Sequence, residues 1–219
     1  PMNIDLNRSL SRLSELALAF AALDEDLPVR PVLDPKVVVK QLTLDLPENG
    51  HNIDEVLDQV ADVLAAAPST SGPRFFNQLY AGRDPAASVA DMMASLANNS
   101  MYTYKVAGPL LLMENLLVRE MGALAGFDNP EGMFTSGGSM SNLAALVCAR
   151  EAAVPGSRED GVDGRRLRVY CSVEAHYSIP KSLGILGLGR RNLVLIPSDE
   201  VGGMQPEALD AAIAADLQA

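Results

Sequence analysis

Hydrophobic residues recur at helical spacing through the first third of the chain. In residues 1–24 they fall three or four positions apart, which predicts an amphipathic helix with charged residues on its other faces. A second helix is predicted from NIDE at 52–55, a sequence typical of a capping box, to a stop at Pro68. Four prolines between residues 25 and 50 predict an extended connector. The apolar positions of the first helix are Leu6, Leu10, Leu13, Ala17 and Phe20.

Further along the chain, the pattern changes from helices alone to helices that alternate with short strands. A methionine-rich helix is predicted over 89–96, and another from Pro109 to about residue 125. Strands that alternate with helices indicate parallel pairing, so the pattern predicts an α/β fold. The predicted strands end at Thr135 and cover 167–172 and 192–196, and the predicted helices between and after them cover 140–153, 178–186 and 206–218.

These patterns divide the chain into a helical arm over residues 1–68 and an α/β part over residues 69–219. The helices of the arm are long for what they could bury against each other, which favours an arm that packs on a second subunit. Three strands are few for a finished α/β sheet, and an amphipathic pattern still runs at Ala219. We therefore expect either a longer chain or a partner chain that completes the sheet.

Composition and charge narrow the classes of partner. The net charge is −11, which argues against nucleic acid or an anionic membrane because both require clustered lysine and arginine. No apolar run reaches membrane-spanning length. Cys148 and Cys171 lack metal-ligand spacing and lie in apolar runs, so we expect buried free thiols in a reducing compartment. The alternative is that one thiol acts as a nucleophile.

A glycine-rich turn, GGSMS at 137–141, lies between a predicted strand and a predicted helix. Backbone amides and the hydroxyls of Ser139 and Ser141 would then stand at a helix N-terminus, where an anion such as phosphate is favoured. The alternative is a turn in which Ser141 merely caps the helix. The turn is neither a P-loop nor a dinucleotide fingerprint, because it lacks both the Gly-Lys-Ser/Thr ending and G-x-G-x-x-G.

His176 follows the next predicted strand and is expected at the same edge of the sheet as the glycine turn. An ordinary loop histidine is the alternative. A phosphate site beside an aromatic base is what a pyridoxal phosphate enzyme needs. Arg74 and Arg83 flank another loop, where they could bind a carboxylate or simply make an apolar turn soluble.

Five motifs in order make the chain resemble a known family. They are PRFFNQL at 73–79, MYTY at 101–104, LME at 112–114, GMFTSGGSMSN at 132–142 and AHYSI at 175–179. Together they resemble the group II pyridoxal-dependent amino-acid decarboxylases, which include glutamate, aromatic amino-acid and cysteine sulfinate decarboxylases. The resemblance covers residues 52–219. It implies a fold-type I enzyme, with residues 69–219 as the first part of its large domain.

The resemblance also implies roles for individual residues. His176 matches the histidine that stacks on the pyridine ring of the cofactor. Ser139, Met140 and Ser141 match the turn that holds the cofactor phosphate. Asn77 and Gln78 match a loop near the cofactor and the substrate carboxylate. Ser100 and Tyr102 match positions that line the substrate side-chain pocket, where relatives acting on cysteine sulfinate or aspartate carry this pair.

The implied activity is pyridoxal-phosphate-dependent decarboxylation of a short acidic amino acid by a cytoplasmic homodimer with swapped N-terminal arms. KVAG at 105–108 departs from the family pattern. The lysine that binds the cofactor covalently is expected beyond residue 219, because none of Lys36, Lys40, Lys105 and Lys181 matches it. Two alternatives stay open. One is another fold-type I activity, such as an aminotransferase or a different lyase, and the other is a non-catalytic fragment that pairs with a complete subunit.

Overall fold

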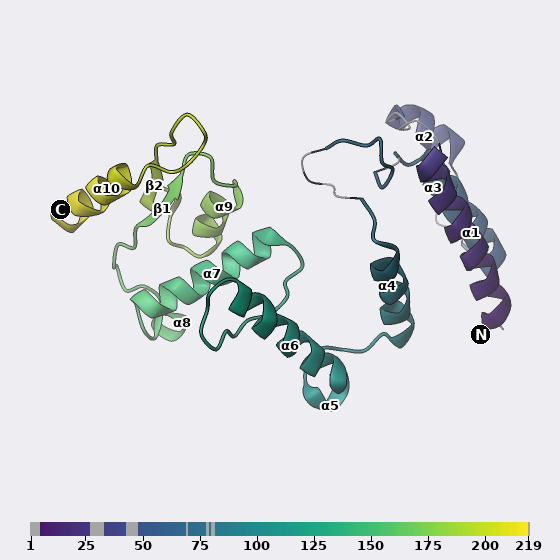
Figure 1. Ribbon diagram of the computed structural model, residues 1–219, viewed down its shortest axis with the longest axis horizontal. Coiled ribbons are helices and arrows are strands. Elements are labelled where there is room, and N and C mark those ends of the chain that lie inside the picture. The colour runs from purple at the N-terminus through teal and green to yellow at the C-terminus, as the bar shows by residue number, and fades with distance from the viewer. Residues whose placement is uncertain are drawn as a thin grey trace. The chain divides into compact units, whose positions relative to one another are not determined.

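The computed structural model describes residues 5–26, 33–42, 48–68, 70–77, 79 and 82–218. The chain forms two compact units, Pro1–Asn99 and Ser100–Ala219. Figure 1 shows the course of the chain through the N-terminal unit and then the C-terminal unit. Each unit has its own internal packing and is described by itself below. None of the described helices combines the length and the apolar composition needed to cross a membrane.

The N-terminal unit contains four helices in its described residues: α1 (Leu6–Asp26), α2 (Pro35–Gln41), α3 (Ile53–Ala66) and α4 (Pro85–Ala97). The expected helix over 1–24 is confirmed as α1 within the described residues, and the helix from the capping box is confirmed as α3. The Asn52 side chain accepts from the Glu55 amide, and the Glu55 carboxylate accepts from the Asn52 amide at 2.9 Å. Pro68 follows the end of α3 directly.

Helix α2 corrects the prediction that residues 25–50 form only an extended connector. The Asp34 side chain accepts a hydrogen bond from the Lys36 amide, and Pro35 occupies the first helical position. Proline is compatible with that position because its missing N–H would have no partner inside the helix. Proline is unfavourable inside a helix, but here Pro35 is the first residue of α2.

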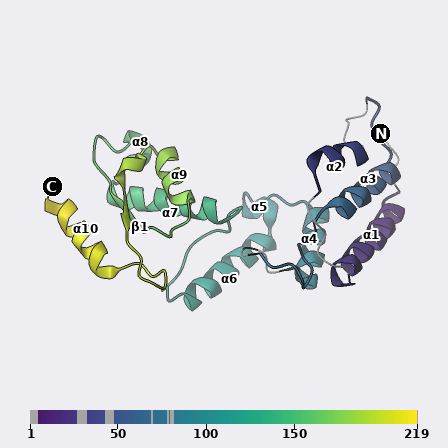
Figure 2. The same ribbon diagram turned by 90° about the horizontal axis from the view of Figure 1, so that it is seen from above.

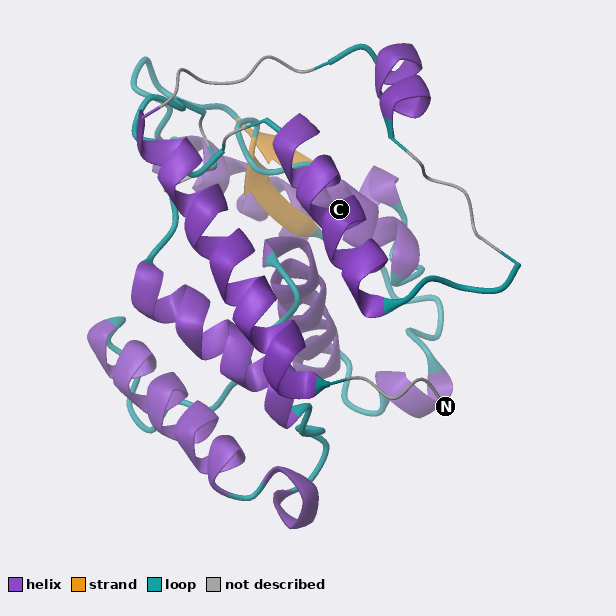
Figure 3. Ribbon diagram, turned by 90° about the vertical axis from the view of Figure 1, so that its right-hand side faces the viewer, coloured by secondary structure: helices purple, strands orange, loops and turns teal. Residues whose placement is uncertain are grey.

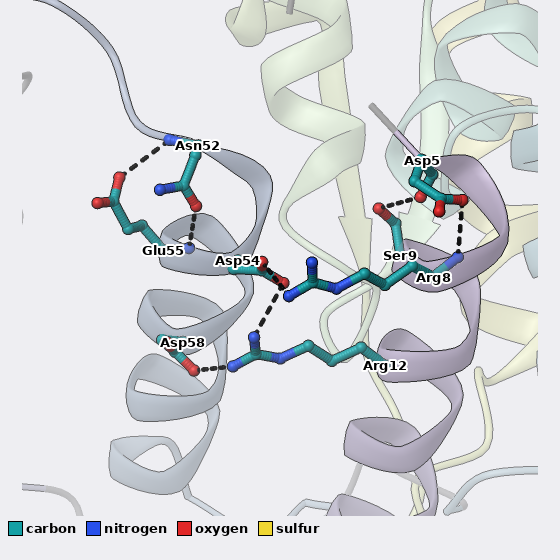
Figure 4. A network of polar contacts seen from close by, with 8 residues as sticks. All are labelled: Asp5, Arg8, Ser9, Arg12, Asn52, Asp54, Glu55 and Asp58. Atoms are coloured by element: carbon teal, nitrogen blue, oxygen red, sulfur yellow. Dashed lines mark hydrogen bonds and ion pairs between the residues drawn. The ribbon is translucent and has the colours of Figure 1, made fainter. Parts of the chain in front are cut away.

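Two arginines of α1 tie it to α3, as Figure 4 shows. The Arg8 guanidinium lies 2.8 Å from Asp54 Oδ2, and Arg12 Nη1 lies 2.9 Å from Asp54 Oδ1. Arg12 also pairs with Asp58 through its second terminal nitrogen. The Asp54 carboxylate is thus shared by two cations. Leu57 is the buried apolar residue of the described part of this unit.

The C-terminal unit carries the α/β part of the fold. The predicted helices over 140–153, 178–186 and 206–218 and the strands over 167–172 and 192–196 are confirmed, with ends shifted by a few residues. Two short helices within predicted loops, α5 and α8, were missed. The elements are α5 (Tyr104–Ala107), α6 (Pro109–Leu124), α7 (Gly138–Ala153), α8 (Ser157–Asp160), β1 (Val169–Ser172), α9 (Ser178–Ile185), η1 (Arg190–Asn192), β2 (Leu193–Ile196) and α10 (Pro206–Gln218).

Strands β1 and β2 pair in parallel, as the alternating pattern predicted. The register places Val169 opposite Leu193 and Ser172 opposite Ile196. The pair is orange in Figure 3, and Figures 1 and 2 show α9 and α10 on opposite sides of it. Leu183 of α9 and Ile196 of β2 are the largest fully buried side chains of the described residues. Helix α9 packs mainly against α7, and the buried core of this unit includes residues of α9 and the last residue of β2.

A polar cluster attaches α10 to β1. Arg168 Nε donates to Asp216 Oδ2 at 2.9 Å, a second guanidinium nitrogen lies 2.8 Å from Oδ1, and the Tyr170 hydroxyl donates to Oδ2 at 2.8 Å. The hydrogen bonds from Arg168 and Tyr170 hold the pKa of Asp216 below its usual range. The carboxylate beside Tyr170 raises the pKa of that phenol. A two-point arginine–carboxylate pair fixes both distance and orientation, so it sets how α10 sits on the sheet.

The predicted strand that ends at Thr135 is wrong as a secondary-structure assignment. A strand requires ladder hydrogen bonds to a neighbouring strand, and residues 131–135 make none to another described strand. The Phe134 amide instead donates to the Glu114 carboxylate of α6 at 3.0 Å. A side chain therefore holds this segment in place beside α6.

Candidate active site

The glycine turn opens directly into helix α7. Gly137 has φ +144°, a conformation that favours glycine, and its carbonyl accepts from the amides of Met140 and Ser141. The amides of Gly138 and Ser139 have no hydrogen-bond partner among the described residues. Two donors at the positive end of a helix are thus left for a ligand, which is the arrangement that binds anions. The turn thus offers donors at the place where the sequence predicts an anion site, and the predicted binding of phosphate stays a prediction.

The hydroxyl groups at this turn form a short chain. The Thr135 hydroxyl donates to the Gly137 carbonyl at 3.1 Å, so its oxygen accepts from the Ser141 hydroxyl at 2.7 Å. In this state Ser141 points its proton at Thr135. No functional role was predicted for Thr135 from the sequence. Its only sequence signal was its place just before the glycine turn.

A cavity of about 410 Å³ lies beside the turn. Residues of α6 and the segment held by Glu114 form its apolar wall, while Gly137, Gly138 and Ser141 form its polar end. The cavity therefore joins an apolar wall to the polar turn. His176 is not among the residues that line this cavity. The apolar part of the lining comprises Val118, Met121, Met133 and Phe134.

His176 is linked to α7 through one buried serine. The His176 Nδ1 atom lies 2.8 Å from Ser178 Oγ, and the Ser178 amide donates to the same nitrogen at 3.2 Å. The Asn142 side-chain amide of α7 donates to Ser178 Oγ at 2.8 Å. Asn142 is one residue after Ser141 of the turn. The structure therefore brings the histidine and the first turn of α7 together, as the two motifs predicted.

An aromatic and a cationic side chain lie beyond His176. The ring centroids of His176 and Tyr177 are 4.2 Å apart, with the rings tilted by 35°. The Lys181 ammonium lies 4.3 Å from the centroid of the Tyr177 ring. Lys181 is exposed, and its ammonium makes a cation–π contact with the Tyr177 ring. The exposed loop around His176 is thus ordered by ring contacts as well as by Ser178.

The predicted substrate residues fall in both units. Ser100 and Tyr102 belong to the C-terminal unit, where the Tyr102 amide donates to Ser100 Oγ at 3.4 Å, and both side chains are exposed. Asn77 is exposed in the N-terminal unit, and Gln78 lies outside the described residues. The roles predicted for these four residues remain predictions.

The structure also shows the surroundings of Arg83 and of the two cysteines, which were candidates for binding and for catalysis. The Arg83 guanidinium lies 5.8 Å from the centroid of the Phe20 ring. Cys148 is exposed, which corrects the expected burial of both thiols. Cys171 is half-buried, and burial raises the pKa of its thiol. A raised pKa disfavours the thiolate, so Cys171 does not have the character of a nucleophile.

The residues at the turn fit the phosphate of a pyridoxal phosphate molecule. A phosphate needs several donors and no side chain in its way. The Gly138 and Ser139 amides and the Ser139 hydroxyl offer the donors, and a Cβ built on Gly138 would meet no atom within 4 Å. The fold and the site thus define a class of protein, an α/β unit whose glycine turn suits a phosphate and whose histidine is linked to the first turn of the same helix.

Comparison with known proteins identifies the family to which the chain belongs. The pyridoxal-dependent decarboxylase conserved domain matches residues 35–219, so the chain belongs to the pyridoxal-dependent decarboxylase family. The acidic amino acid decarboxylase GADL1 of Bos taurus is 38% identical over 177 residues, which are 80% of this chain and 34% of that protein. The cysteine sulfinic acid decarboxylase of Mus musculus is 35% identical over 181 residues, 82% of this chain and 37% of that protein.

A solved structure shows the fold of the family. The crystal structure of mouse CSAD matches with a TM-score of 0.92 at 30% identity, and the match covers 100% of this chain and 47% of that one. The expectation of a fold-type I decarboxylase is therefore confirmed. The chain spans about half the length of this solved relative and about a third of the curated relatives above.

Proposed function

We propose that the protein carrying this chain decarboxylates a short acidic amino acid with pyridoxal phosphate as cofactor. The observation that carries the proposal is that two amides at the start of α7 lack a partner among the described residues, while a histidine is linked to the same helix turn through Ser178. The amides suit the phosphate, and the histidine suits the flat ring. The similarity to decarboxylases of acidic amino acids supports the reaction and the substrate class.

The residues of this chain would hold the cofactor at two points. The amides of Gly138 and Ser139 and the hydroxyl of Ser139 would bind the phosphate, with Ser141 able to turn its hydroxyl from Thr135. His176 would lie against the ring, keep it flat and exclude water from one of its faces. When bound, pyridoxal phosphate supplies an electron sink for the bond to the departing carboxylate. The lysine that binds it covalently would come from the rest of the subunit.

The substrate class rests on Ser100 and Tyr102. A short carboxylate or sulfinate side chain needs donors close to the reacting carbon, and these residues carry a hydroxyl each. Because a site built to hydrogen-bond its substrate leaves buried groups unpaired with the wrong one, such a pair can discriminate steeply. Asn77 and Gln78 match the family loop that approaches the substrate carboxylate, and we propose the same role for them.

The assembly we propose is a homodimer in which the arm over residues 1–68 packs on the second subunit. Large apolar side chains on α4 and α6 are exposed within this chain, including Met93 at 59% and Leu116 at 57%. Exposed apolar surface on this scale is typical of elements that become buried in an interface or a larger domain. The remainder of the subunit and a second copy would cover these faces.

A substrate panel tests the reaction. The complete protein, loaded with pyridoxal phosphate, should release CO2 from cysteine sulfinate, aspartate or glutamate faster than from an aromatic amino acid. The double variant Ser100→Asn with Tyr102→Phe should shift the ratio of kcat/KM toward glutamate. Preference for an aromatic substrate, or a ratio that does not move, would refute the substrate assignment. Transamination without CO2 release would refute the decarboxylase itself.

A matched pair of glycine variants tests the phosphate position. Gly138→Ala places a methyl group in open space at the turn, so the fold should keep its stability while the affinity for pyridoxal phosphate falls. Gly184→Ala is the control, because it is also a helical glycine with room for a Cβ, the nearest atom being Arg190 Nε at 3.6 Å. Equal affinities in the two variants would place the phosphate elsewhere.

A further inference from the structure

We propose that Asn142 and Ser178 are positioning residues that fix the ring of His176 as the tautomer with its proton on Nε2. The role of this arrangement in catalysis rests on the proposed function, but the tautomer itself does not. The inference concerns which atom of the ring carries the proton and what prevents the ring from turning over.

The three residues are buried to very different degrees. His176 lies on an exposed loop, whereas Ser178 is only 2% exposed and lies at the start of α9. Asn142 comes from α7, 36 positions earlier in the chain, and is half-buried. An exposed ring is therefore anchored by a buried hydroxyl that is itself held from a second helix. Such an anchor restrains a side chain that the loop alone would leave free to rotate.

The donor and the acceptor of each hydrogen bond from Asn142 through Ser178 to His176 can be assigned. The Asn142 Nδ2 group can only donate, so Ser178 Oγ accepts from it and has its single proton left to donate. The acceptor within reach of that proton is His176 Nδ1, at 2.8 Å. The Ser178 amide, which is also only a donor, points to the same nitrogen at 3.2 Å.

Two donors that converge on Nδ1 require a lone pair there. A neutral imidazole has one N–H, so the proton must be on Nε2. The Nε2 atom has no partner among the residues that the structure describes, and its N–H is left to face a ligand. A ring turned over by 180° would lose both bonds to Nδ1. Asn142 and Ser178 therefore determine at once the tautomer and the orientation of the histidine.

The ¹⁵N chemical shifts of the histidine ring report the tautomer directly. The experiment uses the complete protein with labelled histidine, without cofactor or substrate, and assigns the signal by its loss in His176→Gln. The expected spectrum of the unmodified protein at neutral pH shows a protonated Nε2 and an unprotonated Nδ1. A protonated Nδ1 in the neutral ring would overturn the proposal.

Variants test whether the two residues are the cause. Asn142→Asp keeps the shape but offers acceptors only, so the Ser178 hydroxyl should turn to the carboxylate and the Nε2–H population should fall. Ser178→Ala should also lower that population, since one donor to Nδ1 is gone. Ser182→Ala is the matched control, because Ser182 is a 3% exposed serine one turn further along the same helix. Tautomer populations unchanged in both Asn142→Asp and Ser178→Ala would overturn the proposal.

Kinetics separate this inference from the proposed function. If both hold, the Asn142 and Ser178 variants lower kcat by about tenfold, the scale of one lost hydrogen bond, and leave KM unchanged. If the protein does not decarboxylate amino acids, the tautomer result can still stand. If decarboxylation is found but the variants keep both the tautomer and kcat of the unmodified protein, the positioning role is refuted and the proposed function stands.

Discussion

Different kinds of contact stabilise the interior of each of the two units of this chain. In the N-terminal unit, α1 and α3 are joined by the guanidinium groups of Arg8 and Arg12, which share the Asp54 carboxylate at the protein surface. In the C-terminal unit, α9 packs against α7, β1 pairs with β2, and Leu183 and Ile196 are fully buried. Exposed ion pairs contribute little to stability, whereas burial of a leucine contributes about 1.5–3 kcal/mol.

This difference indicates which unit can position a reactive group. A histidine must be held to within a fraction of an ångström to act on a bound ring, and only close packing holds a neighbour so firmly. His176 is anchored through Ser178, which is buried at the start of α9, the helix that also carries the fully buried Leu183. In the described part of the N-terminal unit, Leu57 is the buried apolar residue, and apolar positions of α3 such as Val60 are exposed. Its helices are better suited to forming a contact surface than to holding a reactive side chain in a fixed position.

The largest expected effect tests the site of the C-terminal unit. Under the proposed function, His176→Ala in the complete, cofactor-loaded protein would remove the side chain that we expect to stack on the cofactor ring, together with its N–H. We expect kcat to fall by about 10²–10⁴-fold. The melting temperature without cofactor should change little, because the His176 side chain is exposed. Near-normal turnover in steady-state assays would return His176 to the class of ordinary loop histidines.

The next largest effect is the loss of stability when a buried leucine is truncated in the core of either unit. Leu183→Ala should destabilise the C-terminal unit by about 2–5 kcal/mol, since it leaves a cavity at a fully buried position. Hydrogen exchange of the complete protein should show faster opening of β1 and β2, with α3 unaffected. Leu57→Ala is the counterpart in α3 and should speed exchange there alone. Equal responses of both units to either variant would show that they unfold as one.

A smaller effect concerns the attachment of α10 at low pH. Because Arg168 and Tyr170 lower the pKa of folded Asp216, its contribution to stability is present above the unfolded pKa and is lost as the pH falls through the folded one. Asp216→Asn should therefore flatten the acid limb of a plot of urea midpoint against pH. Glu151, whose pKa is lowered by the Gly156 amide and the Ser157 hydroxyl, should keep part of that limb. An unchanged limb in Asp216→Asn contradicts this account.

The smallest effect is expected at the surface of the N-terminal unit. Arg8→Ala and Arg12→Ala remove exposed partners of Asp54, so the shift in urea midpoint should be well below that of Leu183→Ala. Salt should shrink it further, because exposed charges are screened. Arg12→Ala should have the larger effect of the two, as Arg12 also pairs with Asp58. A salt-independent loss comparable to Leu183→Ala would show that this contact is more than a surface ion pair.

The elements that were predicted well share a local cause. Helix α3 begins where the Asn52 and Glu55 side chains and amides satisfy each other, and both partners lie within four residues. The parallel pair β1–β2 followed from strands that alternate with helices. Helix α2 was missed although its Asp34–Pro35 start is also local, because four prolines in one segment suggested a connector. The sequence contained the start signal of α2, but the four prolines were given more weight than that signal.

The sequence by itself determined the helices, the strand pair and the glycine turn, because hydrophobic period, caps and backbone preference act between residues close together in the chain. Tertiary structure alone decided that the segment before the turn is held by Glu114, 20 positions away, rather than paired as a strand within the described fold. It also decided that Asn142 reaches His176 through Ser178, across 36 positions. Both contacts depend on how helices pack, and a hydrogen bond between distant residues exists only once packing has brought its donor and acceptor within 3 Å or so of each other.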